Sequence, residues 1–307
     1  MRIKWLLLFL ISTLAVFSFG QNEKSAEASR QDLSLLNAQH EPPRLGIHWA
    51  RGFNPAPRAA KTNTPDMTYH GGVIMPYTVS ESIFWGPRWT NSSFAADKIT
   101  GLDSWYTGFS DSNYAKTSDE YGGSNGQVGS SVTHNGHLID TSAAANGSST
   151  SAIVAEVCKE IGNPVENGYY PVYVDVGRGH AGYCAYHTFG SCGGVTVQVA
   201  FFFNLDGDAG CDPQDTSRLH SQGLAALANV SGHELSEART DPDTPGAWYD
   251  HHGAENGDKC AWTFNVPLVT FSNGTRWKIQ GEWSNNAYDT RTGYPNSAGQ
   301  PGCLDGH

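Results

Sequence analysis

The feature that most constrains this fold is a helix-forming segment, 217–240, which Pro242 brings to an end. Its stretch from Gly223 to Gly232 has no charged residue, so this part of the helix has no polar face to present to water. Such a helix must be enclosed by other elements, and polar groups that follow on it need partners inside the protein. The chain can enclose it, since 38% of its 307 residues are hydrophobic.

The segments around this helix include several strands. Alternating apolar residues at 79–86 and 170–176 predict two of them, and the nearly continuous apolar run Val195–Phe203 predicts a central strand. Shorter strands are expected at 73–75, 128–132, 137–139, 267–271 and 276–279, the last two as a hairpin around Asn273-Gly274.

Two further helices are expected among these strands. One begins after a cap at Asn91 or Ser92 and runs to Phe109, and the other covers Ala152–Ile161, where Gly162 is placed to end it in a left-handed conformation. The elements do not form a regular βαβ repeat, which predicts the α+β class with a mixed sheet. The 35 glycines indicate a loop-rich fold.

The N-terminus resembles an export signal. Arg2 and Lys4 precede an apolar run, Trp5–Phe17, which is shorter than a membrane span, and small residues at 18 and 20 suit cleavage. We therefore expect a signal peptide over residues 1–20 and a secreted protein, extracellular or in the cell envelope, that is free of the membrane after cleavage. Residues 21–66, rich in Ala, Ser, Asn and Pro, are expected to be a disordered linker before one domain, 67–307.

Charge and cysteines narrow the function further. Lys and Arg minus Asp and Glu is 19 − 30 = −11, so nucleic acid is not an expected partner. The six cysteines form no Cys-x-x-Cys pair, and export favours disulfides over a thiolate metal site. Of the 15 possible pairings we expect Cys260, beside a proposed ligand turn, to bond to Cys303.

The long helix carries the sequence His233-Glu234-Leu235-Ser236-Glu237. His233 and Glu237 lie one turn apart on one helix face, so both can hold a single cation. Zinc hydrolases use this spacing with a Glu directly after the first His, which can deprotonate the metal-bound water. A carboxylate replaces the usual second His here and is itself a competent zinc ligand. The sequence thus predicts a zincin-like Zn²⁺ helix with Glu234 as general base.

A third ligand must come from beyond the helix. Asp258 is the first choice, because it lies on a Gly-bearing turn after a loop long enough to fold back over the helix end. Asp241 and Glu255 remain alternatives. The competing interpretation is that the motif is an ordinary solvated helix face. The absence of charged residues in the preceding helix turns is evidence against that interpretation.

Other side chains have weaker claims to a role. His187 is a candidate for orienting a substrate, and Tyr249 for donating to an oxyanion, although both residue types also serve as structural hydrogen-bonding or packing groups. The aspartates at 206–215 lack the spacing of a calcium loop and are expected to be turn residues.

Several motifs together resemble the exordium or phosphate-induced protein family of plant extracellular proteins and its secreted microbial relatives. In the family's order, they are Gly71-Gly72, Ile83-Phe84-Trp85-Gly86, Tyr183-Cys184-Ala185-Tyr186-His187, the helix motif with Thr240-Asp241-Pro242, Ala247-Trp248-Tyr249 and Glu255-Asn256-Gly257-Asp258-Lys259-Cys260. The resemblance implies an extracellular or cell-wall location and no established reaction. Relatives commonly have Asn at the position of Asp241, which favours Asp258 as the ligand.

Three functional hypotheses follow. The first is a secreted zinc-dependent hydrolase, in particular a peptidase, acting on an extracellular peptide or cell-wall polymer. The second is a non-catalytic extracellular binding or signalling module in which the same residues hold a structural metal or form a polar network. The third, carbohydrate processing, is prompted by nine Trp, but the sequence places no acid/base carboxylate pair for it.

Overall fold

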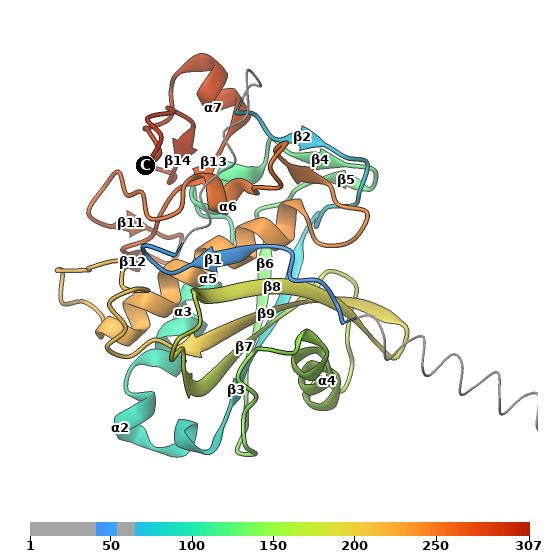
Figure 1. Ribbon diagram of the computed structural model, residues 1–307, viewed down its shortest axis with the longest axis vertical. Helices are drawn as coiled ribbons and strands as arrows, with labels where there is room; N and C mark the ends of the chain where they lie inside the picture. Colours follow the sequence, from blue (N-terminus) through green and yellow to red (C-terminus); the bar gives the residue numbers. More distant parts are fainter. Residues whose placement is uncertain (1–40, 54–64) are drawn as a thin grey trace, which may run out of the picture. The chain divides into compact units, whose positions relative to one another are not determined.

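The computed structural model describes residues 41–53 and 65–307 (Figure 1). The predicted signal peptide lies outside the described residues, as does most of the predicted linker. Within the described part, the largest sheet has six strands. In spatial order they are β1 (Ile47–Trp49), β8 (Tyr183–Cys192), β9 (Val195–Asn204), β7 (Gly168–Gly177), β3 (Thr78–Trp85) and β6 (Val132–Asp140).

The sheet is mixed, as the sequence predicts. Strand β3 runs parallel to β6 and β7, and β7 runs parallel to β9. Strand β8 is antiparallel to β9 and to the edge strand β1. The apolar run predicted as a central strand forms β9, which is buried from residue 197 to residue 203 because it has neighbours on both sides and helices on both faces.

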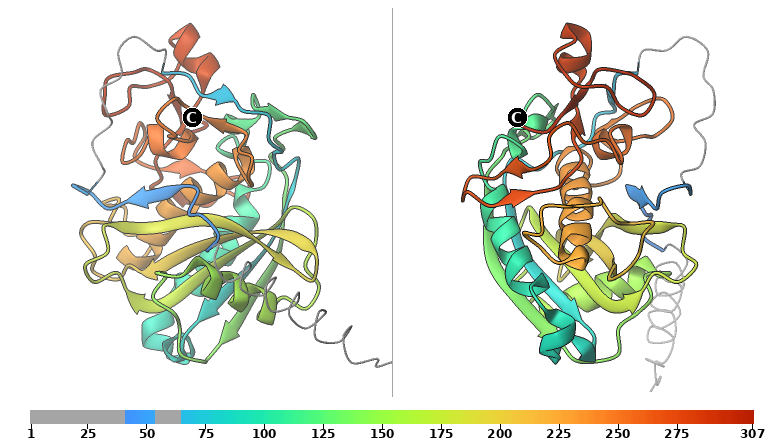
Figure 2. Two further views of the ribbon diagram at one scale, coloured as in Figure 1. Left: turned by 45° about the vertical axis from the view of Figure 1, so that its right-hand side comes forward. Right: turned by 90° about the vertical axis from the view of Figure 1, so that its left-hand side faces the viewer.

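Helices cover both faces of this sheet (Figure 2). On one face the Tyr173 hydroxyl bonds to Tyr106 of α3 and to Ser231 of α5, each at 2.8 Å. Tyr186 is in register with Val172, the neighbour of Tyr173, and therefore points to the opposite face, towards α4. These helices are α3 (Lys98–Phe109), α4 (Thr150–Glu160) and α5 (Gln222–Thr240).

Helix α5 is enclosed as the sequence predicts, since every residue from Gly223 to Thr240 is buried. Ser221 caps its N-terminus by accepting the Leu224 N–H at 3.2 Å. The helix packs on β8, β9 and β1, so side chains near its C-terminal end face the edge of the sheet. No described helix meets the length and hydropathy needed to cross a membrane.

Short elements complete the described fold. They are β2 (Thr68–Tyr69), β4 (Gly122–Gly123), β5 (Gly126–Gln127), β10 (Trp248–Tyr249), β11 (Val269–Thr270), β12 (Arg276–Trp277), β13 (Glu282–Trp283), β14 (Cys303–Leu304), η1 (Pro87–Thr90), η2 (Ala115–Ser118), α2 (Ser92–Ala95), α6 (Asn256–Lys259) and α7 (Asn285–Thr290). The predicted hairpin is formed by β11 and β12 around Gly274, whose φ is 82°.

The structure corrects several local predictions. Residues 73–75 and 128–131 form no strand, and the long helix begins at Gln222 instead of residue 217. The helix expected from 92 to 109 is divided into α2 and α3 at Ala96, whose φ of 46° no helix tolerates. Helix α4 is capped by Ile161 in an extended conformation, so Gly162 is not a left-handed cap. Strand β1 pairs with β8 although it lies inside the predicted linker, so the ordered fold begins before residue 67. The sequence did not predict this strand because three residues are too few to show a period.

All six cysteines are paired in disulfides. Cys260 bonds to Cys303, as predicted, and the other pairs are Cys158–Cys192 and Cys184–Cys211. The Cys260–Cys303 bond joins the end of α6 to β14. It therefore ties the segment carrying the proposed third ligand to the C-terminal part of the fold.

Candidate metal centre

The C-terminal half of α5 faces β1, β8 and α6, and these elements bring the candidate ligands together (Figure 1). His233, Glu234 and Glu237 are all fully buried on α5. Strand β8 contributes His187, whose side chain is also fully buried. Helix α6 crosses this end of α5 and carries Asp258.

One group of donors consists of His233, Glu237 and Asp258, the three ligands predicted from sequence. Their donor atoms lie within 4.8 Å of one another. His233 Nε2 is 3.0 Å from Glu237 Oε1 and 3.8 Å from Asp258 Oδ1. The Asp258 backbone N–H donates to Glu237 Oε1 at 2.9 Å, which fixes α6 against the helix. The Asp258 side chain is 25% exposed, so this group reaches solvent on its α6 side.

A second group consists of His187, Glu237 and Glu255, again with donor atoms within 4.8 Å of one another. His187 Nε2 is 3.3 Å from Glu255 Oε2 and 3.8 Å from Glu237 Oε2. All three side chains are buried. The sequence singled out His187 as a substrate-orienting residue and Glu255 only as an alternative third ligand, whereas the structure places both in one donor group with Glu237.

Glu234 follows His233 on α5 and belongs to neither of these groups, although its charge interacts with those of Glu237 and Asp258. Its Oε1 accepts the His48 backbone N–H at 3.2 Å, and its Oε2 is buried without a hydrogen-bond partner. This is the position expected for a residue that follows a ligand on a helix and points about 100° away from it. Glu234 Oε2 is thus a buried acceptor with no donor of its own.

Gln280 sets the orientation of His233. Its Nε2 donates to the Gly257 carbonyl at 2.9 Å, and its Oε1 accepts the Trp262 N–H at 3.3 Å, so the amide has a defined orientation. The same Nε2 lies 3.1 Å from His233 Nδ1, which accepts, and His233 Nε2 then carries the proton. A cation at Nε2 would move that proton to Nδ1 and would require the Gln280 amide to turn, giving up its bonds to the Gly257 carbonyl and the Trp262 N–H.

His48 of β1 contacts both Gln280 and His233. Its Nε2 lies at hydrogen-bonding distance, 3.0 Å, from Gln280 Oε1, and the centroid of its ring lies 4.4 Å from that of the His233 ring. Burial, and then the charge of His233, hold the pKa of His48 well below its ordinary value of 6.5. Burial lowers the pKa of His187 and of His233 to about 3, so all three rings are neutral at physiological pH.

The carboxylates of the centre have the opposite shift. Burial raises the pKa of Glu234 well above its ordinary value, and the charges of Glu237 and Asp258 add to the effect. Burial likewise raises the pKa values of Glu237, Glu255 and Asp258. Among the described residues, no Lys or Arg lies within 4 Å of a carboxylate oxygen of these four. A buried acidic cluster of this kind needs either protons or metal cations.

Two other residues singled out from sequence lie outside both donor groups. Asp241 accepts the Ala247 N–H, and burial raises its pKa to about 7. Tyr249 is half-buried on β10 and stacks on His70, with ring centroids 3.7 Å apart. The structure places no contact between the Tyr249 hydroxyl and the donor groups within the described residues.

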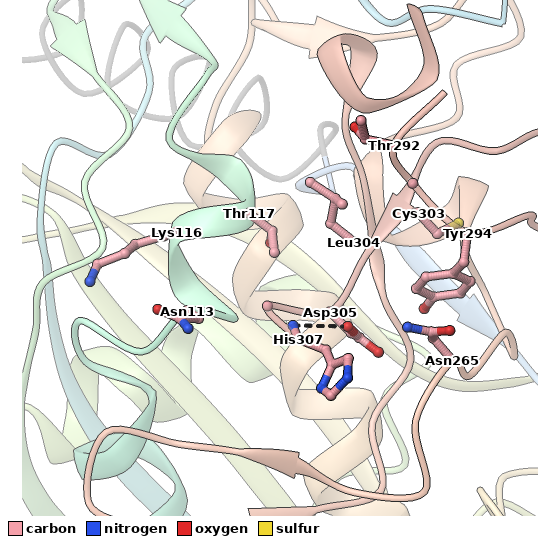
Figure 3. Close-up of a pocket in the computed structure, with 12 residues that line it drawn as sticks. Asn113, Lys116, Thr117, Asn265, Thr292, Tyr294, Cys303, Leu304, Asp305 and His307 are labelled. Carbon is pink, nitrogen blue, oxygen red and sulfur yellow. Dashed lines mark hydrogen bonds between the residues drawn. The ribbon is translucent and has the colours of Figure 1, made fainter. Parts of the chain in front are cut away.

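A pocket of about 530 Å³ opens elsewhere in the fold. Asp305, Asn265 and Tyr294 lie on one side of it and Lys116 on the other (Figure 3). None of the candidate metal ligands lines it, and its link to the centre is Cys303, the disulfide partner of Cys260.

Sequence reasoning missed His48 and Gln280. His48 fell inside the predicted linker, and Gln280 follows a predicted hairpin without any motif of its own. A glycine close to the donors was also missed: Gly46 precedes β1, and an ideal Cβ built on it would lie 1.8 Å from Glu237 Oε2. No periodicity or spacing marks residues that reach a site only through tertiary packing.

Comparisons with protein-family models, with curated proteins and with solved structures find no match to this chain. The residues of the candidate centre are therefore the basis for assigning a function.

The Cys260–Cys303 disulfide offers a first prediction. Replacing both cysteines with Ser opens a link across 43 residues and is expected to cost about 4 kcal/mol. It also releases α6, so Zn²⁺ affinity at Asp258 should fall. The matched control replaces Cys158 and Cys192, whose disulfide links positions 34 residues apart and lies away from the centre. This replacement should lower Tm without changing Zn²⁺ affinity. Thermal unfolding and Zn²⁺ titration measure both effects, and equal Zn²⁺ affinity in the two double variants would contradict the prediction.

Proposed function

We propose that this protein is a metal-dependent hydrolase, in particular a peptidase, with Zn²⁺ held by His233, Glu237 and Asp258. The observation that carries the proposal is Glu234, which follows the His233 donor on α5, has a buried Oε2 without a partner, and interacts electrostatically with Glu237 and Asp258 of the donor group. The set of one imidazole and two carboxylates suits Zn²⁺, and the disulfides leave no thiol to compete.

The chemistry divides between the cation and the protein. When bound, Zn²⁺ supplies Lewis acidity for a carbonyl group of the substrate. Glu234 accepts and returns a proton at Oε2, while its Oε1 stays fixed by the His48 N–H. Asp258 is the partly exposed member of the donor group, so we infer that substrate approaches from the α6 side.

Export and membership of the exordium family form part of the same proposal. Three disulfides support an oxidising compartment. The substrate is then an extracellular peptide or a cell-wall polymer.

The test is a peptide-library digest with Zn²⁺-loaded protein and with protein stripped by a chelator. We expect cleavage only in the loaded sample and recovery when Zn²⁺ is returned. Metal analysis of the same samples is the control. Absence of cleavage by a fully loaded protein, with the library covering all side-chain classes, would overturn the peptidase proposal.

A second candidate is a non-catalytic extracellular module with a structural metal. The observation that favours it is the burial of His233 and Glu237, since a structural site is closed whereas a catalytic site keeps an open position. In that case Zn²⁺ binds and raises Tm, but no peptide is cleaved.

A further inference from the structure

We propose that the centre holds two divalent cations, bridged by Glu237, with the second ion bound by His187 and Glu255. This inference rests on the proposed metal site of His233, Glu237 and Asp258 and extends it.

The two oxygens of Glu237 face different partners. Oε1 lies 3.0 Å from His233 Nε2 and accepts the Asp258 N–H. Oε2 lies 3.8 Å from His187 Nε2, in the group that also includes Glu255, and it has no hydrogen-bond partner. Each group supplies one imidazole and one further carboxylate of its own. A bridging carboxylate with separate terminal ligands is the arrangement that holds two metal ions about 3.5 to 4 Å apart.

Gly46 permits the close approach of two of these donors to the backbone. An ideal Cβ on this residue would lie 1.8 Å from Glu237 Oε2 and 2.7 Å from His187 Nε2, well inside van der Waals contact. A residue larger than Gly would therefore displace the Glu237 carboxylate and the His187 ring, which are donors to the proposed second ion.

The charge of the ligands favours cations in both groups. Glu237, Glu255 and Asp258 are buried acidic ligands, and no Lys or Arg of the described chain pairs with them. Cations would replace the protons that these carboxyl groups otherwise need in the interior.

Neighbouring acidic groups have their own partners. Glu282 Oε1 accepts the Tyr114 hydroxyl at 2.7 Å, and Asp250 pairs with Lys259 at 2.8 Å. The Tyr114 hydroxyl is neutral, however, so an ionised Glu282 adds negative charge near Glu237 and Asp258.

The test is the Zn²⁺ content of the folded, full chain after dialysis against Zn²⁺. We expect two ions per chain in the wild type and one in Glu255→Gln, which removes a ligand of the second ion. Gly46→Ala should hold fewer than two, because its Cβ would displace the Glu237 carboxylate and the His187 ring. His180→Gln, at an exposed histidine, is the control and should keep two. Circular dichroism establishes that each variant is folded, and the nearly isosteric Glu255→Gln serves alone if Gly46→Ala does not fold.

The outcomes separate this inference from the proposed function. One ion in the wild type, unchanged in Glu255→Gln, overturns the second site and leaves the first intact. No ion in the wild type overturns both. Two ions in every variant show that His187 and Glu255 do not hold the second one, and this too overturns the inference.

Discussion

Replacing Glu234 with Gln is expected to lower peptide turnover by a factor of about 10² or more while the Zn²⁺ content stays unchanged. Gln keeps the size of the side chain and an oxygen that can accept the His48 N–H, which is 3.2 Å from Glu234 Oε1. The Gln amide nitrogen, which replaces Glu234 Oε2, cannot take up a proton as the carboxylate oxygen does. Because Glu234 belongs to neither donor group, its loss as a base should not release metal.

The measurement compares initial rates on one cleaved peptide, with each protein loaded and its metal counted. Glu166→Gln, at an exposed position far along the chain, is the matched control and should retain full turnover. Equal rates for wild type and Glu234→Gln would exclude Glu234 as the base. Loss of metal from Glu234→Gln would instead make it a ligand.

Local patterns predicted the elements that carry the first donor group. The charge-free stretch before His233 predicted an enclosed helix, and α5 is buried over its length. The spacing of His233 and Glu237 predicted one shared face, and their donor atoms are 3.0 Å apart. These predictions succeed because helical periodicity converts sequence spacing directly into geometry.

The second donor group could not be predicted in this way. His187 comes from β8 and Glu255 from the segment before α6, 68 residues further along the chain. Their meeting depends on how β8 packs on α5 and on where α6 crosses it. Gly46, directly before the third element β1, lies beside His187 and Glu237, and the three residues of β1 give no periodic signal. Only tertiary packing assigns a role to the second oxygen of Glu237.

The pH dependence of stability is the second large effect that we expect. In the metal-free protein, Glu234, Glu237, Glu255 and Asp258 have pKa values raised well above the ordinary range, chiefly by burial. The folded state therefore keeps protons that the unfolded state releases at about pH 4 to 4.5. The free energy of unfolding must fall as pH rises towards the raised pKa values.

The buried histidines act in the opposite direction at lower pH. His187 and His233 have pKa values of about 3, whereas an unfolded chain protonates histidine near pH 6.5. Their contribution to stability is complete above pH 6.5 and is lost as pH falls below it. The carboxylate effect is therefore seen without opposition only above pH 6.5, and this window separates the two sets of groups.

Zn²⁺ should abolish the decline in that window, because the cation replaces the protons that the buried carboxylates otherwise retain. At a free concentration of 100 Kd it adds about 2.7 kcal/mol, or roughly 5 to 10 °C in Tm for a protein of this size. Kd itself falls as pH rises, since fewer protons compete for the ligands. At fixed Zn²⁺, the Tm difference between loaded and metal-free protein is therefore expected to widen from pH 6.5 to pH 8.

Scanning calorimetry of the loaded and the metal-free protein across that pH range measures this difference, with Glu166→Gln as the control. A Tm difference that stays constant from pH 6.5 to pH 8 would mean that metal binding displaces no protons in this range, which would contradict protonation of the buried carboxylates in the metal-free protein there.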